Sequence, residues 1–184
     1  MASGTPDGNG AGPTSERGSE RADRVFDARI LKEPLSVLPQ HSPLCFSREQ
    51  FVSEAMHAMQ KEHRGCVLVT DDGTDQSRLL GIFTERDVLY RIIDRGRNPA
   101  TLPLAEVMTR SPDALLSRAT VAFVLNRMAV GGFRHVPVVD EQERPVALIS
   151  VRDVVQFLVD HFPREIMNLP PEVGGNITSS REGA

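Results

Sequence analysis

An internal repeat constrains the fold of this chain more than any other feature of its sequence. The octapeptide GIFTERDV at residues 81–88 returns in altered form as ALISVRDV at residues 147–154. In both copies a run rich in apolar and β-branched residues leads into a helix-like stretch. Matching positions of the two octapeptides lie 66 residues apart, whereas upstream the separation is 69, as between Pro34 and Pro103. The sequence therefore predicts an internal duplication, with the length difference placed in a polar loop of the first copy.

The duplication divides the chain into two repeats, 34–95 and 103–161, joined by a linker at 96–102. A chain of 184 residues with 40% hydrophobic content has the length for one medium domain or two small ones. Because one repeat of about 60 residues buries little surface, we expect the two to share a core. Residues 1–24, rich in Gly, Ser, Pro and charge, are expected to be disordered, as is most of the tail at 162–184.

Hydrophobic periodicity predicts the element order β, α, β, β, α in each copy. Ser47, followed three residues later by Gln50, predicts a capping box for the first helix. The predicted strands are 44–46, 66–70 and 79–83 in the first copy and 114–116, 135–139 and 146–149 in the second. The predicted helices are 48–62 and 85–95 in the first copy and 118–130 and 151–161 in the second.

Composition excludes several classes of function. The net charge of −4 and the lack of a basic patch with interleaved aromatic residues give no reason to expect nucleic acid as a partner. No apolar run reaches the length of a membrane span, so we expect no membrane association and a cytoplasmic location. No nucleophile lies beside an evident base, and neither a glycine-rich phosphate loop nor metal-ligand spacing occurs. We therefore expect a protein that is not an enzyme and binds no metal.

Four motifs together resemble a pair of cystathionine β-synthase (CBS) domains, the arrangement called a Bateman module. They are GIFTERD at 81–87, VMTRSP at 107–112, FRHVPVVDE at 133–141 and ISVRD at 149–153, and the resemblance covers about 34–161. It implies an α+β fold of two β-α-β-β-α CBS repeats packed with pseudo-two-fold symmetry. It also implies that two such modules pair into a homodimer.

Each strand-to-helix corner carries a hydroxyl residue, an Arg two positions later and an Asp three positions later. This spacing is typical of a capping box, in which the two side chains only satisfy free amides at the helix start. Asp is shorter than the usual Glu or Gln, which favours an outward-facing carboxylate that accepts hydrogen bonds from both hydroxyls of a ribose. The free amides at the helix start and the Arg side chain favour a phosphate group. The candidates are Thr84, Asp87, Ser150 and Asp153 for ribose, as the resemblance also implies, and Arg86 and Arg152 for phosphate.

A second candidate group surrounds the strand at 135–139. Arg134 and His135 are either a solvated strand end or, as the resemblance implies, phosphate-binding residues. An apolar slot for adenine is predicted from Pro112, Ala114, Val136 and Pro137.

The two copies differ at these positions. The first copy has Gly65 and Cys66 where the second has Arg134 and His135, so equal occupancy of two pockets is not expected. The second corner has Ala147 in place of Gly81, and its methyl group would crowd a backbone that must approach a ligand closely.

Two functions remain open. The first is a regulatory sensor that binds an adenine nucleotide, AMP, ADP or ATP, between the repeats. ATP could bring Mg²⁺ with it. The sensor would signal to a partner protein through a changed orientation of the two repeats. S-adenosylmethionine fits the same ribose chemistry. The alternative is a homodimeric interaction scaffold with vestigial pockets. Neither function requires a bound cofactor.

Overall fold

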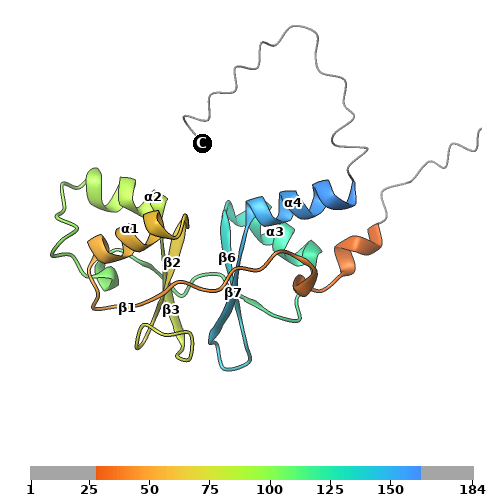
Figure 1. Cartoon of the computed structure of the whole chain (residues 1–184), viewed down its shortest axis with the longest axis horizontal. Helices are drawn as coiled ribbons and strands as arrows, with labels where there is room; N and C mark the ends of the chain where they lie inside the picture. The colour runs from red at the N-terminus through yellow and green to blue at the C-terminus, as the bar shows by residue number, and fades with distance from the viewer. Residues whose placement is uncertain (1–27, 163–184) are drawn as a thin grey trace, which may run out of the picture.

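The computed structural model describes residues 28–162 and forms two similar units side by side (Figure 1). The prediction for residues 1–24 lies outside the described residues, as does that for the tail at 162–184 apart from its first residue. The first unit holds β1 (Cys45–Ser47), α1 (Val52–Lys61), β2 (Cys66–Thr70), β3 (Leu79–Thr84), α2 (Glu85–Asp87) and the π-helical turn η3 (Val88–Ile93). The second holds β5 (Leu115–Leu116), α3 (Val121–Gly131), β6 (His135–Val139), β7 (Pro145–Ser150) and α4 (Val151–His161). Short elements precede each unit: η1 (Ala28–Lys32), η2 (Leu35–Val37), η4 (Leu104–Glu106) and β4 (Thr109–Arg110).

This order confirms the predicted α+β fold with two β-α-β-β-α repeats. One sheet has the order β1-β2-β3-β4 and the other β5-β6-β7. In both, the first strand runs parallel to the second and the third runs antiparallel to it. A parallel pair needs a crossover connection, which α1 supplies in the first unit and α3 in the second.

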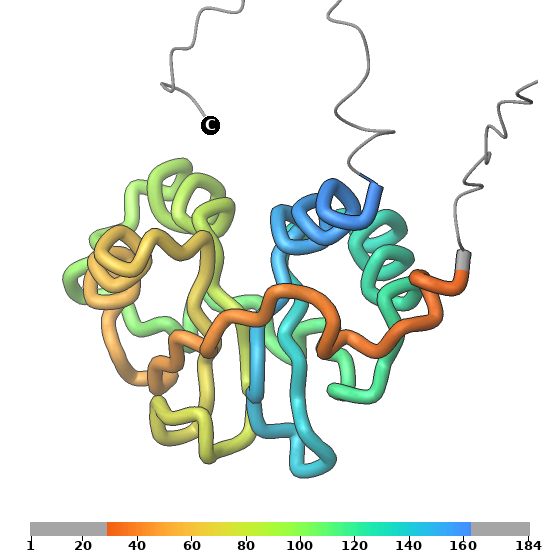
Figure 2. The backbone as a smooth tube through the Cα atoms, turned by 45° about the vertical axis from the view of Figure 1, so that its right-hand side comes forward, coloured from red at the N-terminus to blue at the C-terminus, as the bar shows by residue number. Residues whose placement is uncertain are grey.

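The segments that begin the two repeats are exchanged between them. Leu35, from the start of the first repeat, is fully buried in the core of the second, against α3 and β6. Leu104, 69 positions later, is fully buried in the core of the first, against α1 and β2. Figures 1 and 2 show the orange N-terminal segment crossing from the second unit to the first before it enters β1. Each repeat therefore completes the core of the other.

The two units also share a junction. Cys66, Leu68 and Ile82 of the first repeat form one buried cluster with Leu148 of the second. The expectation of a shared core is thus met in two ways, by this junction and by the exchanged segments.

The first helix of each repeat begins three to four residues later than predicted. The cause is the exchanged segment, whose backbone holds the preceding residues extended. Val52 N donates to Leu102 O at 2.9 Å, and Val121 N donates to Glu33 O at 2.9 Å. Periodicity in one repeat could not reveal a hydrogen-bond acceptor supplied by a segment next to the other.

The predicted capping box of Ser47 and Gln50 is wrong. Gln50 Oε1 does accept a hydrogen bond from Ser47 N at 2.8 Å, but this pair closes the turn after β1. The helix is entered at Phe51, which is extended and donates its amide to Glu54 Oε2 at 3.0 Å.

Gly81 is needed for packing and does not approach the cavity described below. It pairs with Arg110 of β4, and a methyl group at Gly81 would lie 2.5 Å from Met108 Sδ and 3.0 Å from Thr109 O. The prediction that the backbone at Gly81 lies close to a ligand is therefore wrong. The close neighbours of Gly81 are Met108 and the strand β4.

Gly81→Ala is expected to lower the free energy of unfolding by about 1–3 kcal/mol, because the added methyl overpacks a tight site. Urea denaturation measures the change. In a Met108→Ala background the same substitution should cost clearly less, because the closest clashing atom is gone. An equal cost in both backgrounds would show that Met108 is not the obstacle.

Candidate functional site

The corner between β3 and α2 is closed by a capping box. Thr84 N and Thr84 Oγ1 donate to Asp87 Oδ2 at 2.9 and 2.8 Å, and Asp87 N donates to Thr84 Oγ1 at 3.4 Å. Asp87 is only 7% exposed. Its carboxylate therefore uses one oxygen, Oδ2, for the helix start, while Asp87 also lines the cavity described below.

The other oxygen of Asp87 is held by Arg91, a residue that sequence reasoning missed. Arg91 Nε lies 3.1 Å from Asp87 Oδ1, and Arg91 Nη2 donates to Thr109 Oγ1 at 3.0 Å. Arg91 Nη1 donates to the carbonyl of Val107. The guanidinium thus ties the corner to residues 107–109, at the start of the second repeat.

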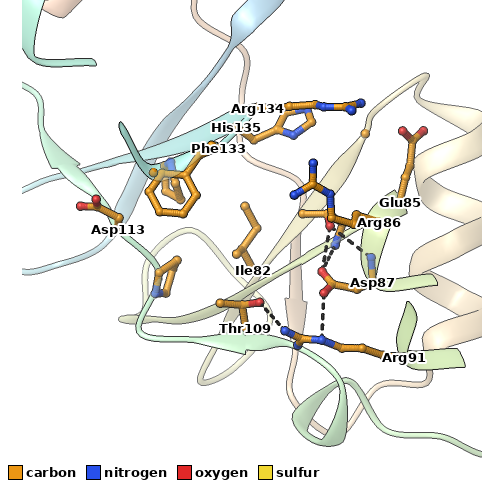
Figure 3. A pocket seen from close by; sticks show the side chains of 16 residues that line it. Ile82, Glu85, Arg86, Asp87, Arg91, Thr109, Asp113, Phe133, Arg134 and His135 are labelled. Atoms are coloured by element: carbon orange, nitrogen blue, oxygen red, sulfur yellow. Dashed lines mark hydrogen bonds and ion pairs between the residues drawn. The ribbon is translucent and has the colours of Figure 1, made fainter. Parts of the chain in front are cut away.

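A cavity of about 340 Å³ lies beside this corner, between the two repeats (Figure 3). The first repeat contributes the corner, and the second contributes the start of β6. The corner of the first repeat, which carries Thr84 and Asp87, and the basic strand start of the second repeat, which carries Arg134 and His135, therefore line one cavity. Its lining residues are Gly65, Ile82, Thr84, Glu85, Arg86, Asp87, Arg91, Thr109, Pro112, Asp113, Gly131, Gly132, Phe133, Arg134, His135 and Pro137.

Positive charge gathers on one side of the cavity. Figure 3 shows the guanidinium of Arg86 between Asp87 and the pair formed by Arg134 and His135. Neither Arg86 nor Arg134 forms an ion pair within the part of the chain that the structure describes. Burial lowers the pKa of His135, so its ring is neutral at pH 7, although Glu85 opposes this shift. The two arginines therefore carry the charge available to an anion.

Gly65 leaves the space that His135 occupies. A methyl group at Gly65 would lie 2.8 Å from His135 Cε1. Because the first repeat has a glycine and not a basic residue at this position, the ring of His135 from the second repeat fits beside it.

The apolar wall differs from the predicted one. Pro112 and Pro137 line the cavity, joined by Ile82 and Phe133, which were not among the predicted residues. Side chains alternate along a strand, so Val136 faces the core of the second repeat, where it is fully buried. Ala114 is half-buried and does not line the cavity. Phe133 adjoins Arg134 in the motif FRHVPVVDE, a signal that could have marked it as a lining residue.

Comparison with known proteins gives the family. The family model described as "CBS domain" matches residues 35–94 and 104–160. The chain belongs to the CBS domain family.

Relatives with CBS domains occur in several organisms. A CBS domain-containing protein of Arabidopsis thaliana is 32% identical over 132 residues, which is 72% of this chain and 23% of that protein. An uncharacterized conserved protein from Pyrococcus horikoshii has a TM-score of 0.61 at 25% identity, covering 68% of this chain and 92% of that one. A CBS domain protein from Pyrobaculum aerophilum complexed with AMP has a TM-score of 0.60 at 23% identity, covering 66% and 89%. The chain spans about a fifth of the length of the first curated relatives that it matches.

The corner of the second CBS domain has the same capping box but a different partner. Ser150 N and Ser150 Oγ each donate to Asp153 Oδ2 at 2.7 Å. Asp153 Oδ1 lies 2.9 Å from His41 Nε2, which comes from the exchanged segment. Arg152 is exposed, and neither it nor the Ser150–Asp153 pair lines the cavity. The predicted site residues therefore do not form one group.

Two further findings concern residues 28–162. No helix there is long and apolar enough to cross a membrane. No group of three or more His, Cys, Asp or Glu residues there could hold a metal ion.

Proposed function

We propose that this CBS pair is a non-catalytic regulatory module that binds an adenine nucleotide (AMP, ADP or ATP) in the cavity between its two domains. One observation carries the proposal: the cavity combines a hydroxyl and carboxylate corner from one domain with two unpaired arginines, one from each domain. Its volume of about 340 Å³ lies within the range of about 300–1,000 Å³ of small-molecule sites.

Each part of the nucleotide has a matching surface. The phosphate lies by Arg86 and Arg134, where charge-assisted hydrogen bonds form. The ribose hydroxyls meet Asp87, and the base packs against Phe133 and Pro137. A triphosphate brings its own Mg²⁺, since the described residues hold no metal-binding cluster.

The same geometry supports a signalling role. Because the ligand contacts both CBS domains, its affinity depends on their relative orientation, and binding shifts the protein toward the arrangement that it prefers. A partner protein reads the change. The AMP complex of the Pyrobaculum aerophilum protein shows that a similar fold holds this nucleotide. At that level of identity it supports the fold alone, so the proposal rests on the residues of the cavity.

An exposed apolar surface favours the alternative of a homodimeric scaffold. Leu89, Tyr90 and Ile93 on η3 are 61, 64 and 66% exposed, and Val155 on α4 is 52% exposed. Such a surface is typical of an interface. The occupied carboxylates of both corners fit vestigial pockets. We propose that the protein forms a homodimer whichever of the two functions it has. A measurement of ligand binding is therefore needed to distinguish the nucleotide sensor from the scaffold.

Asp87→Ala is expected to weaken AMP binding by about 10- to 100-fold, because a hydrogen bond to a charged group contributes about 1.5–3 kcal/mol. Isothermal titration calorimetry of folded, nucleotide-free protein measures the affinity and the stoichiometry. Asp153→Ala is the matched control: its aspartate has the same capping box and similar burial but lies outside the cavity.

Equal weakening by both substitutions would show that the loss comes from the cap and not from ligand contact. If the unaltered protein gives no heat with AMP, ADP, ATP or S-adenosylmethionine, the sensor is overturned and the scaffold stands.

A further inference from the structure

The helix after the first corner is wider than its counterpart α4 after the second corner. Its hydrogen-bonded turns in η3 are π-helical and span one more residue than those of an α-helix. In the second domain, Phe157 follows Asp153 by four residues and is buried at 3% exposure. The residue four positions after Asp87 is Arg91, whereas the buried residue is Ile92, at 1% exposure. The core position is thus reached one residue later in the first domain.

The chemistry of Arg91 explains the difference. A guanidinium is too costly to bury in the apolar place that Phe157 takes. The helix widens instead into the π-helical η3, with Asp94 N donating to Leu89 O at 3.0 Å. Ile92 then fills the core, and Arg91 turns toward the cavity. Such widened turns are frequent at functional sites, and α4 is α-helical over its whole length.

Arg91 also competes for the acceptor that a ribose needs. A carboxylate offers about four acceptor positions. Two of those of Asp87, both on Oδ2, serve Thr84, and Arg91 Nε lies against the other oxygen as an ion-pair partner 3.1 Å from Oδ1. Two ribose hydroxyls therefore cannot both bind Asp87 while Arg91 stays in place.

Building on the proposed function, we propose that Arg91 is a latch that a nucleoside must displace from Asp87 to bind, and that it determines the affinity of the cavity. All three guanidinium nitrogens contact protein acceptors, on Asp87, Val107 and Thr109, unlike those of Arg86 and Arg134. Arg91 thus acts on the carboxylate and not on the phosphate. Arg91 is also the residue around which η3 widens. When a nucleoside releases Arg91 from Asp87, the conformation of η3 changes, and η3 carries the exposed side chains of Leu89, Tyr90 and Ile93.

Tyr90 provides a direct reporter of η3, because it is the only tyrosine of the chain and lies next to Arg91. Protein labelled with 3-fluorotyrosine gives one fluorine resonance for this helix. Ligand binding should shift the resonance if the latch moves.

The test uses adenosine, which lacks phosphate, so that any loss of a phosphate contact cannot hide the effect. Arg91→Met keeps an unbranched chain about as far as the position of Nε and removes the charged guanidinium, and it should tighten adenosine binding about tenfold in calorimetry. Thr109→Val removes one anchor of Arg91 and should tighten binding by a smaller factor, and it serves if Arg91→Met does not fold. The fluorine resonance of unliganded Arg91→Met should lie near that of the liganded native protein.

Each outcome decides the question. Unchanged or weaker adenosine binding in both variants, with binding by the native protein, overturns the latch and leaves the proposed function standing. Adenosine binding by Arg91→Met alone supports the latch, and the native protein is overturned as a sensor if it also fails to bind AMP. No binding of adenosine or AMP by any of the proteins overturns both proposals.

Discussion

Leu35→Ala is expected to destabilise the second CBS domain and leave the first nearly unchanged, although Leu35 lies in the sequence of the first repeat. The side chain is fully buried in the core built by α3, β6 and β7 of the second domain. Truncating such a leucine removes apolar contacts and leaves a cavity, which costs about 2–5 kcal/mol. Hydrogen exchange resolved along the chain shows which domain loses protection.

Leu104→Ala is the matched substitution. It removes an equally buried side chain at the corresponding position of the second repeat, which packs in the core of the first. Protection should now fall in α1 and β2 and persist in α3 and β6. If each variant instead loosened the domain to which its sequence belongs, the exchange of segments would be contradicted. Equal loss in both domains would mean that the two cores open as one unit.

Repetition made most of the fold predictable from the sequence. A strand or helix signal that is weak in one copy gains support when it returns at a fixed distance, so β2, β6 and α4 have the predicted bounds. The exchange was not predictable, because Leu35 carries the same apolar signal whichever core it enters. The late starts of α1 and α3 follow from that exchange.

Part of the predicted set of residues lies together in the structure, but its geometry was not predictable from the sequence. Thr84, Asp87, Arg86, Arg134 and His135 all line one cavity, yet the sequence could not show that the corner and the basic strand come from different domains. It also could not show which function of the aspartate prevails, since capping and ribose binding use the same spacing.

Arg91 was missed for a different reason. A charged residue in a helical pattern is usually assigned to the solvent side. Only alignment with Phe157 of the second copy shows that it falls on a core position, and a charge at a core position requires an explanation. The structure resolves the conflict by widening the helix at η3.

Replacing both Arg86 and Arg134 by Ala is expected to weaken AMP binding by about 100-fold or more and to leave adenosine binding nearly unchanged. Each guanidinium lacks an ion-pair partner in residues 28–162, so neither loses an existing pair when it binds phosphate. A charge-assisted hydrogen bond of this kind contributes about 1.5–3 kcal/mol. Because His135 is neutral at pH 7, it does not replace the lost charge.

Arg152→Ala is the control for this prediction, since Arg152 aligns with Arg86, is exposed and lies outside the cavity. It removes one of the two positive charges that the double variant removes and should leave the AMP affinity unchanged, which separates a local contact from the effect of net charge. Calorimetry at two salt concentrations adds a second criterion: the AMP affinity of the native protein should fall with salt more steeply than that of the double variant. If adenosine and AMP lost affinity equally, the arginines would shape the cavity and not bind the phosphate.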